Sequence, residues 1–320
     1  MDSVAGPEFP SVARRPPPGR IASRRHLDQN RRVHQPHQTR PARPPRAESR
    51  EVTELKQLKD AHPELAPAVD MQLALVEMQR RVQSRVPIPT RRIDEAQLRR
   101  HIAERRPLLA FEEIPLDWTE MRLMVRQTVD ILRRFGSLDE EGCTTLQAIA
   151  REPQQFQETV RRWYQSAVPG TPASASADST GMLDQVLTLA MRPCLARCAE
   201  TLLPQLDLAA WDAPRCPLCG GEPEFSTITP AADRLLLCGR CTGAWHFHPL
   251  ACPFCDNRDR TRITSFASRD GRYRLYGCDV CHRYLKAFDG RHGGRGVLLT
   301  VDTIATLPLD AAAIQKGYQS

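Results

Sequence analysis

The sequence predicts a multidomain α+β protein, in which an all-helical region precedes two tandem four-cysteine metal modules of the rubredoxin or zinc-ribbon kind. Two observations lead to this prediction. Apolar residues recur at helical spacing through much of residues 51–210, and four C-x-x-C pairs follow between Cys216 and Cys281. A chain of 320 residues is long enough to build such domains. The expected boundaries are a tail at 1–50, a helical domain at 51–210, and metal modules at 211–250 and 251–320.

Residues 1–50 are expected to form a disordered Arg/Pro-rich tail. They contain nine prolines, eleven arginines and four acidic residues, and they show almost no apolar periodicity. A segment of this composition buries too little apolar surface to offset the entropy lost on ordering. The arginine excess of this tail accounts for the whole net charge of +7. The rest of the chain is therefore balanced in charge, which argues against a nucleic-acid-binding body.

The distribution of cysteine and apolar residues also suggests in which cellular compartment the protein resides. No run of eighteen apolar residues is present, so we expect no membrane insertion. Arginine pairs occur in the tail, but the apolar stretch that an export signal requires does not follow them. Paired cysteines that bind metal are typical of a reducing compartment, and we therefore expect a cytoplasmic protein. Four nested disulfides in a secreted protein are the competing interpretation.

Helices are predicted along residues 51–210. Residues 65–86 carry apolar side chains at helical spacing as far as Pro87, which ends the pattern. An extended connector is expected at 107–116 and a loop at 168–177. Further helices are expected at 94–105, 117–135, 138–150, 153–166 and 182–203. This region contains no Gly-rich phosphate loop, no Ser/His/Asp arrangement and no convincing pair of carboxylates, so we predict no catalytic or cofactor-binding residues. Closed four-cysteine sites leave no coordination position for a substrate, and we therefore expect that the protein is not an enzyme.

Three cysteines lie outside the C-x-x-C pairs. Cys194 and Cys198 stand four residues apart on the helix that contains Pro193, a spacing that could hold a metal or form a reactive pair. Small buried cysteines on an apolar helix face are the commoner arrangement, and we interpret both residues in that way. Cys143 is interpreted as a further unreactive thiol.

The four C-x-x-C pairs carry the predicted chemistry. Two residues between cysteines let both thiolates of a tight turn face one centre, and two such turns complete a tetrahedral four-sulfur site. Spacers of eighteen, ten and twenty-two residues separate the pairs. The predicted metal ligands of the two sites are Cys216, Cys219, Cys238, Cys241, Cys252, Cys255, Cys278 and Cys281.

Hairpins in the spacers suggest which pairs share a metal ion. Short apolar runs at 225–228 and 235–237 lie between the first two pairs, and runs at 261–266 and 273–276 lie between the last two. Asp-Gly at 270–271 is a strong hairpin signal. A hairpin brings the cysteine turns at its two ends together, so we expect the first pair to join the second and the third to join the fourth. A crossed arrangement, first with third and second with fourth, is the alternative.

Histidines and arginines near the cysteines do not need a role in metal binding. His246, His248 and His282 could replace a cysteine as ligand, but eight cysteines are available and we expect no histidine ligand. The arginines from Arg258 to Arg274 indicate either a solvated strand face or a surface that docks an acidic partner. After the last cysteine pair, a strand is expected at 297–301 and a closing helix at 309–318.

The same residues resemble a known family. Cys216-Pro-x-Cys-Gly, Cys252-Pro-Phe-Cys255, the 278–281 pair with Tyr284-Leu-Lys286, and the ending Leu307-Pro-Leu-Asp310 are similar to the formate dehydrogenase accessory proteins of FdhE type. The resemblance covers about residues 51–320, and its specific part is the cysteine region. The arginine-rich tail lies outside it.

This resemblance implies a helical domain followed by tandem rubredoxin-like modules that bind iron, with zinc as the alternative metal. It also implies a cytoplasmic, chaperone-like accessory factor that binds the catalytic subunit of a molybdenum-dependent formate dehydrogenase during maturation. Two other functions remain open on the sequence. One is a thiol enzyme that transfers sulfur or electrons, and the other is a zinc-ribbon protein that binds nucleic acid.

Overall fold

The helices predicted from apolar periodicity are present in the computed structural model, which describes residues 48–167, 177–292 and 294–319. The described residues belong to one compact unit, Ala47–Ser320. Almost all of the predicted tail, and most of the predicted loop at 168–177, lie outside the described residues. The domain boundaries near 210 and 250 stay predictions.

Seven helices precede the cysteine region in the described part of the chain, and capping residues fix where several of them begin. Ser49 and Asp94 cap α1 and α3, and Asp117 and Asp139 cap α4 and α5, each by accepting backbone N–H groups of the first turn. Pro153 opens α6, and Pro193 lies inside α7. The helices are α1 (Arg50–Ala61), α2 (Ala66–Gln83), α3 (Glu95–Glu104), α4 (Trp118–Arg134), α5 (Glu140–Arg151), α6 (Pro153–Gln165) and α7 (Ala177–Leu202).

The cysteine region forms a six-stranded sheet in the order β3-β2-β1-β6-β5-β4. Its strands are β1 (Pro223–Ile228), β2 (Arg234–Cys238), β3 (Ala244–His246), β4 (Ile263–Ala267), β5 (Tyr273–Cys278) and β6 (Tyr284–Asp289). Both predicted hairpins are confirmed, since β1 pairs with β2 and β4 with β5 in antiparallel registers. The turn between β4 and β5 carries Gly271 at φ 70°, a left-handed conformation that glycine adopts without strain.

The sequence-based prediction missed β3 and β6, and β6 is the strand that joins the two halves. It pairs antiparallel with β5 of its own hairpin and parallel with β1 of the other, from Ser226 opposite Ala287 to Ile228 opposite Asp289. The buried Ser226 hydroxyl donates to the Lys286 carbonyl across this joint at 3.0 Å. The two cysteine modules therefore share one sheet.

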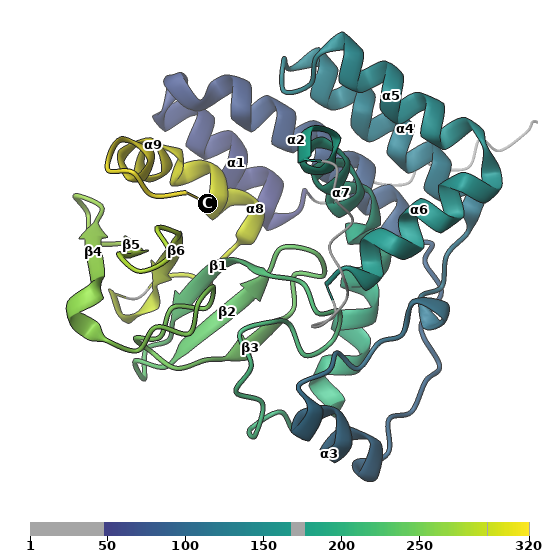
Figure 1. Cartoon of the computed structure of the whole chain (residues 1–320). Coiled ribbons are helices and arrows are strands. Elements are labelled where there is room, and N and C mark those ends of the chain that lie inside the picture. Colours follow the sequence, from purple (N-terminus) through teal and green to yellow (C-terminus); the bar gives the residue numbers. More distant parts are fainter. Residues whose placement is uncertain (1–47, 168–176, 293, 320) are drawn as a thin grey trace, which may run out of the picture. The chain divides into compact units, whose positions relative to one another are not determined.

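The expected strand at 297–301 is wrong. Leu299 begins α8 (Leu299–Ala305), which is followed by α9 (Leu307–Gln315). The physical reason is the buried carboxylate of Asp302, which accepts the Leu298 backbone N–H at 2.7 Å and holds the first turn of the helix. Val301 and Ile304 then face α1 and α2, whereas Leu299 packs against the sheet residues Phe225 and Phe288. α8 thus lies between α1 and the sheet, as Figure 1 shows.

One large apolar core joins the helices to the first half of the sheet. It runs from Leu75 and Val129 in the helices to Leu236 and Trp245 in the sheet, and it includes the four cysteines of the first two pairs. The opposite face of the sheet is covered by α8 and α9. Within the described ranges no helix has the length and apolar character needed to cross a bilayer.

Candidate metal centres

The four C-x-x-C turns share one backbone geometry. In each turn the first cysteine donates its N–H to the carbonyl five residues later, and the residue after the second cysteine donates its N–H back to the first cysteine. The first set of bonds measures 3.0, 2.9, 2.8 and 2.9 Å for Cys216, Cys238, Cys252 and Cys278, and the returning set lies between 2.8 and 3.1 Å. This repeated loop turns both cysteine side chains of a pair toward the same side.

The returning residue has a left-handed backbone in every turn. Gly220 has φ 74°, and its counterparts Thr242, Asp256 and His282 have φ 58°, 55° and 56°. The sequence-based prediction missed this role. Only at Gly220 does the residue type itself indicate a left-handed backbone, because glycine adopts positive φ without strain. Threonine, aspartate and histidine more often have negative φ, so the sequence does not reveal the left-handed positions in the other three turns.

The Sγ atoms gather into two groups of four. The first contains Cys216, Cys219, Cys238 and Cys241, and the second contains Cys252, Cys255, Cys278 and Cys281. Within each group the ligand atoms lie within 4.8 Å of one another. The first pair thus joins the second, and the third joins the fourth, as the hairpins predict. The crossed arrangement is not the one that the structure shows.

The distances between sulfurs suit a tetrahedral metal. Four sulfurs about 2.3 Å from one ion at tetrahedral corners lie about 3.8 Å from one another. In the first group the separations between sulfurs are 3.5 Å for Cys216–Cys241 and 3.4 Å for Cys219–Cys238. In the second group they are 3.7 Å both for Cys252–Cys281 and for Cys255–Cys278. All-sulfur tetrahedra suit zinc or iron.

The pKa values of the thiols are shifted in different directions within each group. In the first group burial raises the pKa of Cys216 well above its ordinary value. Burial acts on Cys238 in the same direction, but hydrogen bonds from the other three thiols hold the pKa of Cys238 well below that value. In the second group burial raises the pKa of Cys252 and of Cys255, whereas backbone N–H groups keep that of Cys278 low despite burial. Without a metal each group thus favours a thiolate at one position while others resist ionisation, and a bound cation would supply the charge that stabilises all four.

The first group is built into the helical core. All four of its cysteines are buried. The connector after α3 binds the first turn directly, because Leu108 and Leu109 donate their N–H groups to Pro217 and Leu218 at 2.8 and 2.9 Å. Tyr164 of α6 fixes the same connector by donating its hydroxyl to the Leu109 carbonyl.

The second turn passes close to Leu203, the residue after α7, at Gly243. A Cβ there would lie 2.5 Å from Leu203 Cδ1 and 3.3 Å from the Cys241 sulfur. Arg240 of the same turn lies over the Trp163 ring of α6 at 4.0 Å and donates to the Trp163 and Tyr164 carbonyls. The connector after α3, helix α6 and the residue after α7 therefore all contact the turns of the first centre.

The second group lies at the surface. Cys255 is exposed and Cys281 is partly exposed, while Cys252 and Cys278 are buried. Its polar surroundings include the Asn257 side chain, whose Nδ2 lies 3.7 Å from the Cys278 sulfur. Arg234, the first residue of β2, reaches the loop before Cys252 and is buried there. The two groups thus share turn geometry but differ in access to solvent.

The remaining sequence candidates are placed away from these groups. Cys194 and Cys198 are buried, and burial raises their pKa values to about 11 and about 12. Cys143 is also buried, with its pKa raised by burial. Such thiols stay protonated at neutral pH, which disfavours a nucleophilic role. Among the described residues, neither group of four contains a histidine.

The arginines of the second hairpin are mostly engaged locally. Arg258 pairs with Asp256, Arg272 with Asp270, and Arg274 with the buried Asp289. These pairs fit the solvated strand face better than a bare basic surface.

The fold and part of the sequence are similar to those of known proteins. The crystal structure of the FdhE protein from Pseudomonas aeruginosa matches with a TM-score of 0.54 and 21% identity, over 84% of this chain and 91% of that chain. The proteins named FdhE from Escherichia coli strain K12 and from strain O127:H6 are 29% and 30% identical over 106 residues. This chain resembles FdhE proteins in sequence and in fold.

The resemblance is partial in length. The matched stretch is 32% of this chain and 34% of each of those Escherichia coli proteins, so the chain spans about a third of the length of the curated relatives that it matches. No family model matches the chain. The FdhE-type fold, a helical region followed by two four-cysteine groups, is thereby confirmed, and the activity and partners of FdhE proteins do not transfer by this match alone.

Proposed function

We propose that the chain is an accessory factor for the maturation of a molybdenum-dependent formate dehydrogenase and that it binds the catalytic subunit of that enzyme. The observation that carries this proposal is the combination of an FdhE-like fold with both four-cysteine groups. The resemblance to the FdhE type supplies the client, because that family acts in formate dehydrogenase assembly.

The eight grouped cysteines are proposed as ligands of two metal ions, with Cys216, Cys219, Cys238 and Cys241 on the first and Cys252, Cys255, Cys278 and Cys281 on the second. Iron is favoured by the family resemblance, and zinc is the alternative. When bound, the metal would supply positive charge that keeps four thiolates together and thereby stabilises the turns. The protein's own residues orient the sulfurs through the paired hydrogen bonds of each turn.

A protein that binds a client without turning over a small molecule fits this design. Four protein ligands leave no open coordination position for a substrate. We therefore propose a non-enzymatic, chaperone-like role in the cytoplasm, where thiols remain reduced. The large core that joins the first centre to the helices supports a docking surface that depends on metal, because loss of the metal would disturb α6 and α7 as well as the turns.

The test is capture of a purified formate dehydrogenase catalytic subunit by the immobilised full chain. We expect binding by the parent and at least a tenfold loss when Cys216 and Cys219 are both changed to serine. Cys143→Ser is the matched control, because Cys143 is buried but lies outside both groups. It should bind as the parent does.

A cell-based assay completes the test. Cells that lack the protein should lose most formate dehydrogenase activity, and the parent and Cys143→Ser should restore it. The proposal is wrong if the deletion leaves that activity intact, or if the Cys216/Cys219 double variant binds the catalytic subunit as tightly as the parent.

A further inference from the structure

Arg234 is a buried cation that connects the two cysteine modules. It opens β2 in the first module and is 5% exposed. Its Nη1 donates to the Ala251 carbonyl at 2.9 Å, directly before Cys252, and lies 3.5 Å from the Pro249 carbonyl. Its guanidinium also lies over the Tyr276 ring of β5, 5.5 Å from the ring centroid. An arginine from the first half of the sheet is therefore held beside the second centre.

No carboxylate pairs with Arg234 among the described residues. The other buried arginine there, Arg192, pairs with Glu224 at 2.9 Å and donates to the Gly239 carbonyl next to Cys238. Arg234 instead has carbonyl and ring partners only, and the Nε atoms of both arginines have no hydrogen-bond partner. Since arginine stays charged in proteins, burial without a counter-ion is strongly unfavourable.

The second cysteine group lies beside Arg234 and would carry negative charge once it binds a metal. Arg234, Cys252 and Cys278 are among the residues that line one small cavity of about 10 Å³, as are Phe254 and Arg283. A space of that size holds no small-molecule ligand. Arg283 pairs with Glu222 at 2.9 Å, a carboxylate that it shares with Arg215, and it stacks on Phe254. The charge of Arg234 is thus the one that lacks a carboxylate among the described residues that line this cavity.

We propose that Arg234 is the counter-cation of the second metal centre and a positioning residue for its third cysteine turn. This inference rests on the proposed binding of metal by the four cysteines. Four thiolates around a divalent ion carry a net charge of about −2, and around a trivalent ion about −1. A buried positive charge from the neighbouring module favours the more negative state, so Arg234 ties the properties of the second centre to the folding of the first module.

The iron-loaded protein offers the sharpest test. Reconstituted full-length protein is titrated by spectroelectrochemistry, with one electron per iron passing between the ferric and ferrous states. The second couple is identified as the one that disappears first under a chelator, because Cys255 is exposed. In Arg234→Met the ratio of ferrous to ferric affinity at this site should fall about tenfold, which lowers its potential by about 59 mV. The first couple should not move.

Two further variants separate charge from shape. Arg234→Lys keeps the charge and should keep the second potential close to that of the parent. Arg192→Met removes the equally buried arginine that Glu224 already neutralises, and it should leave the second couple unchanged. If Arg234→Met does not fold, Arg234→Gln is measured in its place.

Different results reject the role of Arg234 and the second metal centre itself. Three results would overturn the role of Arg234 as counter-cation. The second potential could shift equally in Arg234→Lys and Arg234→Met, it could stay unchanged in Arg234→Met, or both potentials could shift equally. A parent protein that takes up metal only at the first group would overturn the second centre itself and this inference with it. Two filled centres with an unchanged second potential would reject only the role of Arg234.

Discussion

At the scale of single residues, the cysteine turns rely on positions outside the C-x-x-C pattern. Thr242, Asp256 and His282 adopt left-handed backbones that cost a residue with a Cβ about 1 kcal/mol each. Each is held by its own N–H bond to the first cysteine of the turn. At Gly221 a Cβ would lie 2.8 Å from the Cys238 sulfur, so the backbone must pass close to that ligand. The geometry of each centre therefore depends on neighbours as well as on sulfurs.

Asp289 provides a residue-scale prediction with a defined pH dependence. Its buried carboxylate accepts from Arg291 at 2.7 Å and from Arg274 at 2.7 Å. These bonds hold the pKa of Asp289 well below its ordinary value in the folded state. Asp289→Asn should lower the free energy of unfolding by about 2 kcal/mol at pH 7, because hydrogen bonds to a charged group are lost.

The sign of the pH effect follows from the lowered pKa. An unfolded aspartate takes up its proton near pH 3.9, whereas the folded carboxylate stays charged to lower pH. The stabilisation is therefore complete above about pH 4 and shrinks as pH falls below that value. Urea unfolding of parent and variant at matched pH measures the difference. The exposed Asp60→Asn is the control and should change stability by less than about 0.5 kcal/mol. A pH-independent difference would contradict this account.

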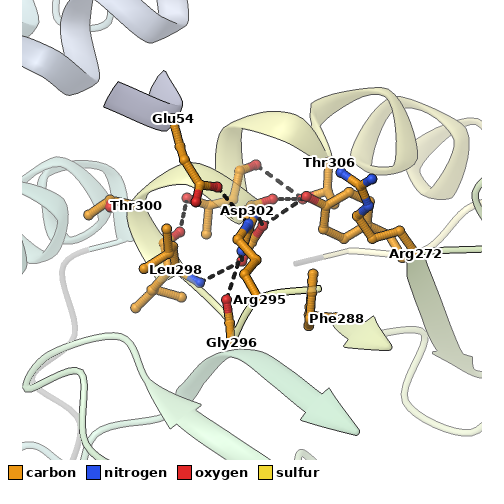
Figure 2. A network of polar contacts seen from close by, with 12 residues as sticks. Glu54, Arg272, Phe288, Arg295, Gly296, Leu298, Thr300, Asp302 and Thr306 are labelled. Carbon is orange, nitrogen blue, oxygen red and sulfur yellow. Dashed lines mark hydrogen bonds and ion pairs between the residues drawn. The ribbon is translucent and has the colours of Figure 1, made fainter. Parts of the chain in front are cut away.

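At the scale of elements, a polar network ties the N-terminal helix to the C-terminal ones. The Asp302 carboxylate accepts from Arg295 Nη1 at 2.9 Å, from the Tyr273 hydroxyl at 2.8 Å and from the Leu298 N–H. Arg295 Nε also pairs with Glu54 of α1 at 2.6 Å. Figure 2 shows Arg295 between Glu54 and Asp302. Glu54 and Arg295, from opposite ends of the chain, thus belong to one network. Thr300 adds a second link by donating to Glu51, 249 residues away, at 2.9 Å.

Loss of this link should loosen α1 selectively. Glu54→Gln removes one charge from the pair with Arg295, and we expect a cost of about 1 kcal/mol, since that pair is largely shielded from solvent. Amide exchange in Arg50–Ala61 should accelerate about fivefold, and exchange in β1 should stay unchanged. Hydrogen-exchange mass spectrometry measures both.

A matched glutamate provides the control for this element. Glu77 pairs with Arg81 within α2, and both side chains are mostly exposed. Glu77→Gln should therefore leave exchange in both helices nearly unchanged. Equal acceleration in the two variants, or acceleration throughout the sheet in Glu54→Gln, would show that the network does not act on α1 alone.

At the scale of the whole molecule, the two centres are unequal. The first is fully buried and belongs to the largest apolar core, with turns bonded to the α3–α4 connector and to α6. The second has one exposed and one partly exposed cysteine, and neither of its buried cysteines, Cys252 and Cys278, belongs to that core. Local opening is expected to be easier where fewer buried contacts must be broken.

The order of metal loss should reflect this difference. In a protein that carries two ions, a chelator should remove the ion of the second centre at least tenfold faster than that of the first. Release is followed by the absorbance of the metal–chelator complex, which should rise in two phases of equal size. Cys255→Ser should accelerate or abolish the fast phase only. A single phase, or loss of the slow phase in that variant, would contradict the assignment.

Melting should separate the centres as well. Removal of the first ion exposes core that includes α6 and α7, whereas removal of the second affects β4 to β6 first. We therefore expect that Cys216→Ser lowers the midpoint of helix unfolding, followed by circular dichroism, more than Cys255→Ser does.

The sequence by itself determined the features that depend on local chemistry. Apolar spacing located most of the helices, because that signal acts within a few residues. Cysteine pairs, with the hairpins between them, were enough to predict which sulfurs lie together. The same residues carried the resemblance to FdhE proteins.

Only the tertiary structure decided the rest, because it depends on partners that are distant in the chain. The run Val297–Val301 has strand-like composition, but the Asp302 carboxylate and the packing of Val301 on α1 and α2 make its end a helix. β6 is defined by its parallel pairing with β1, which no local pattern reveals. The burial of the first centre, the exposure of the second and the position of Arg234 beside Ala251 likewise arise from segments that meet only in the folded chain.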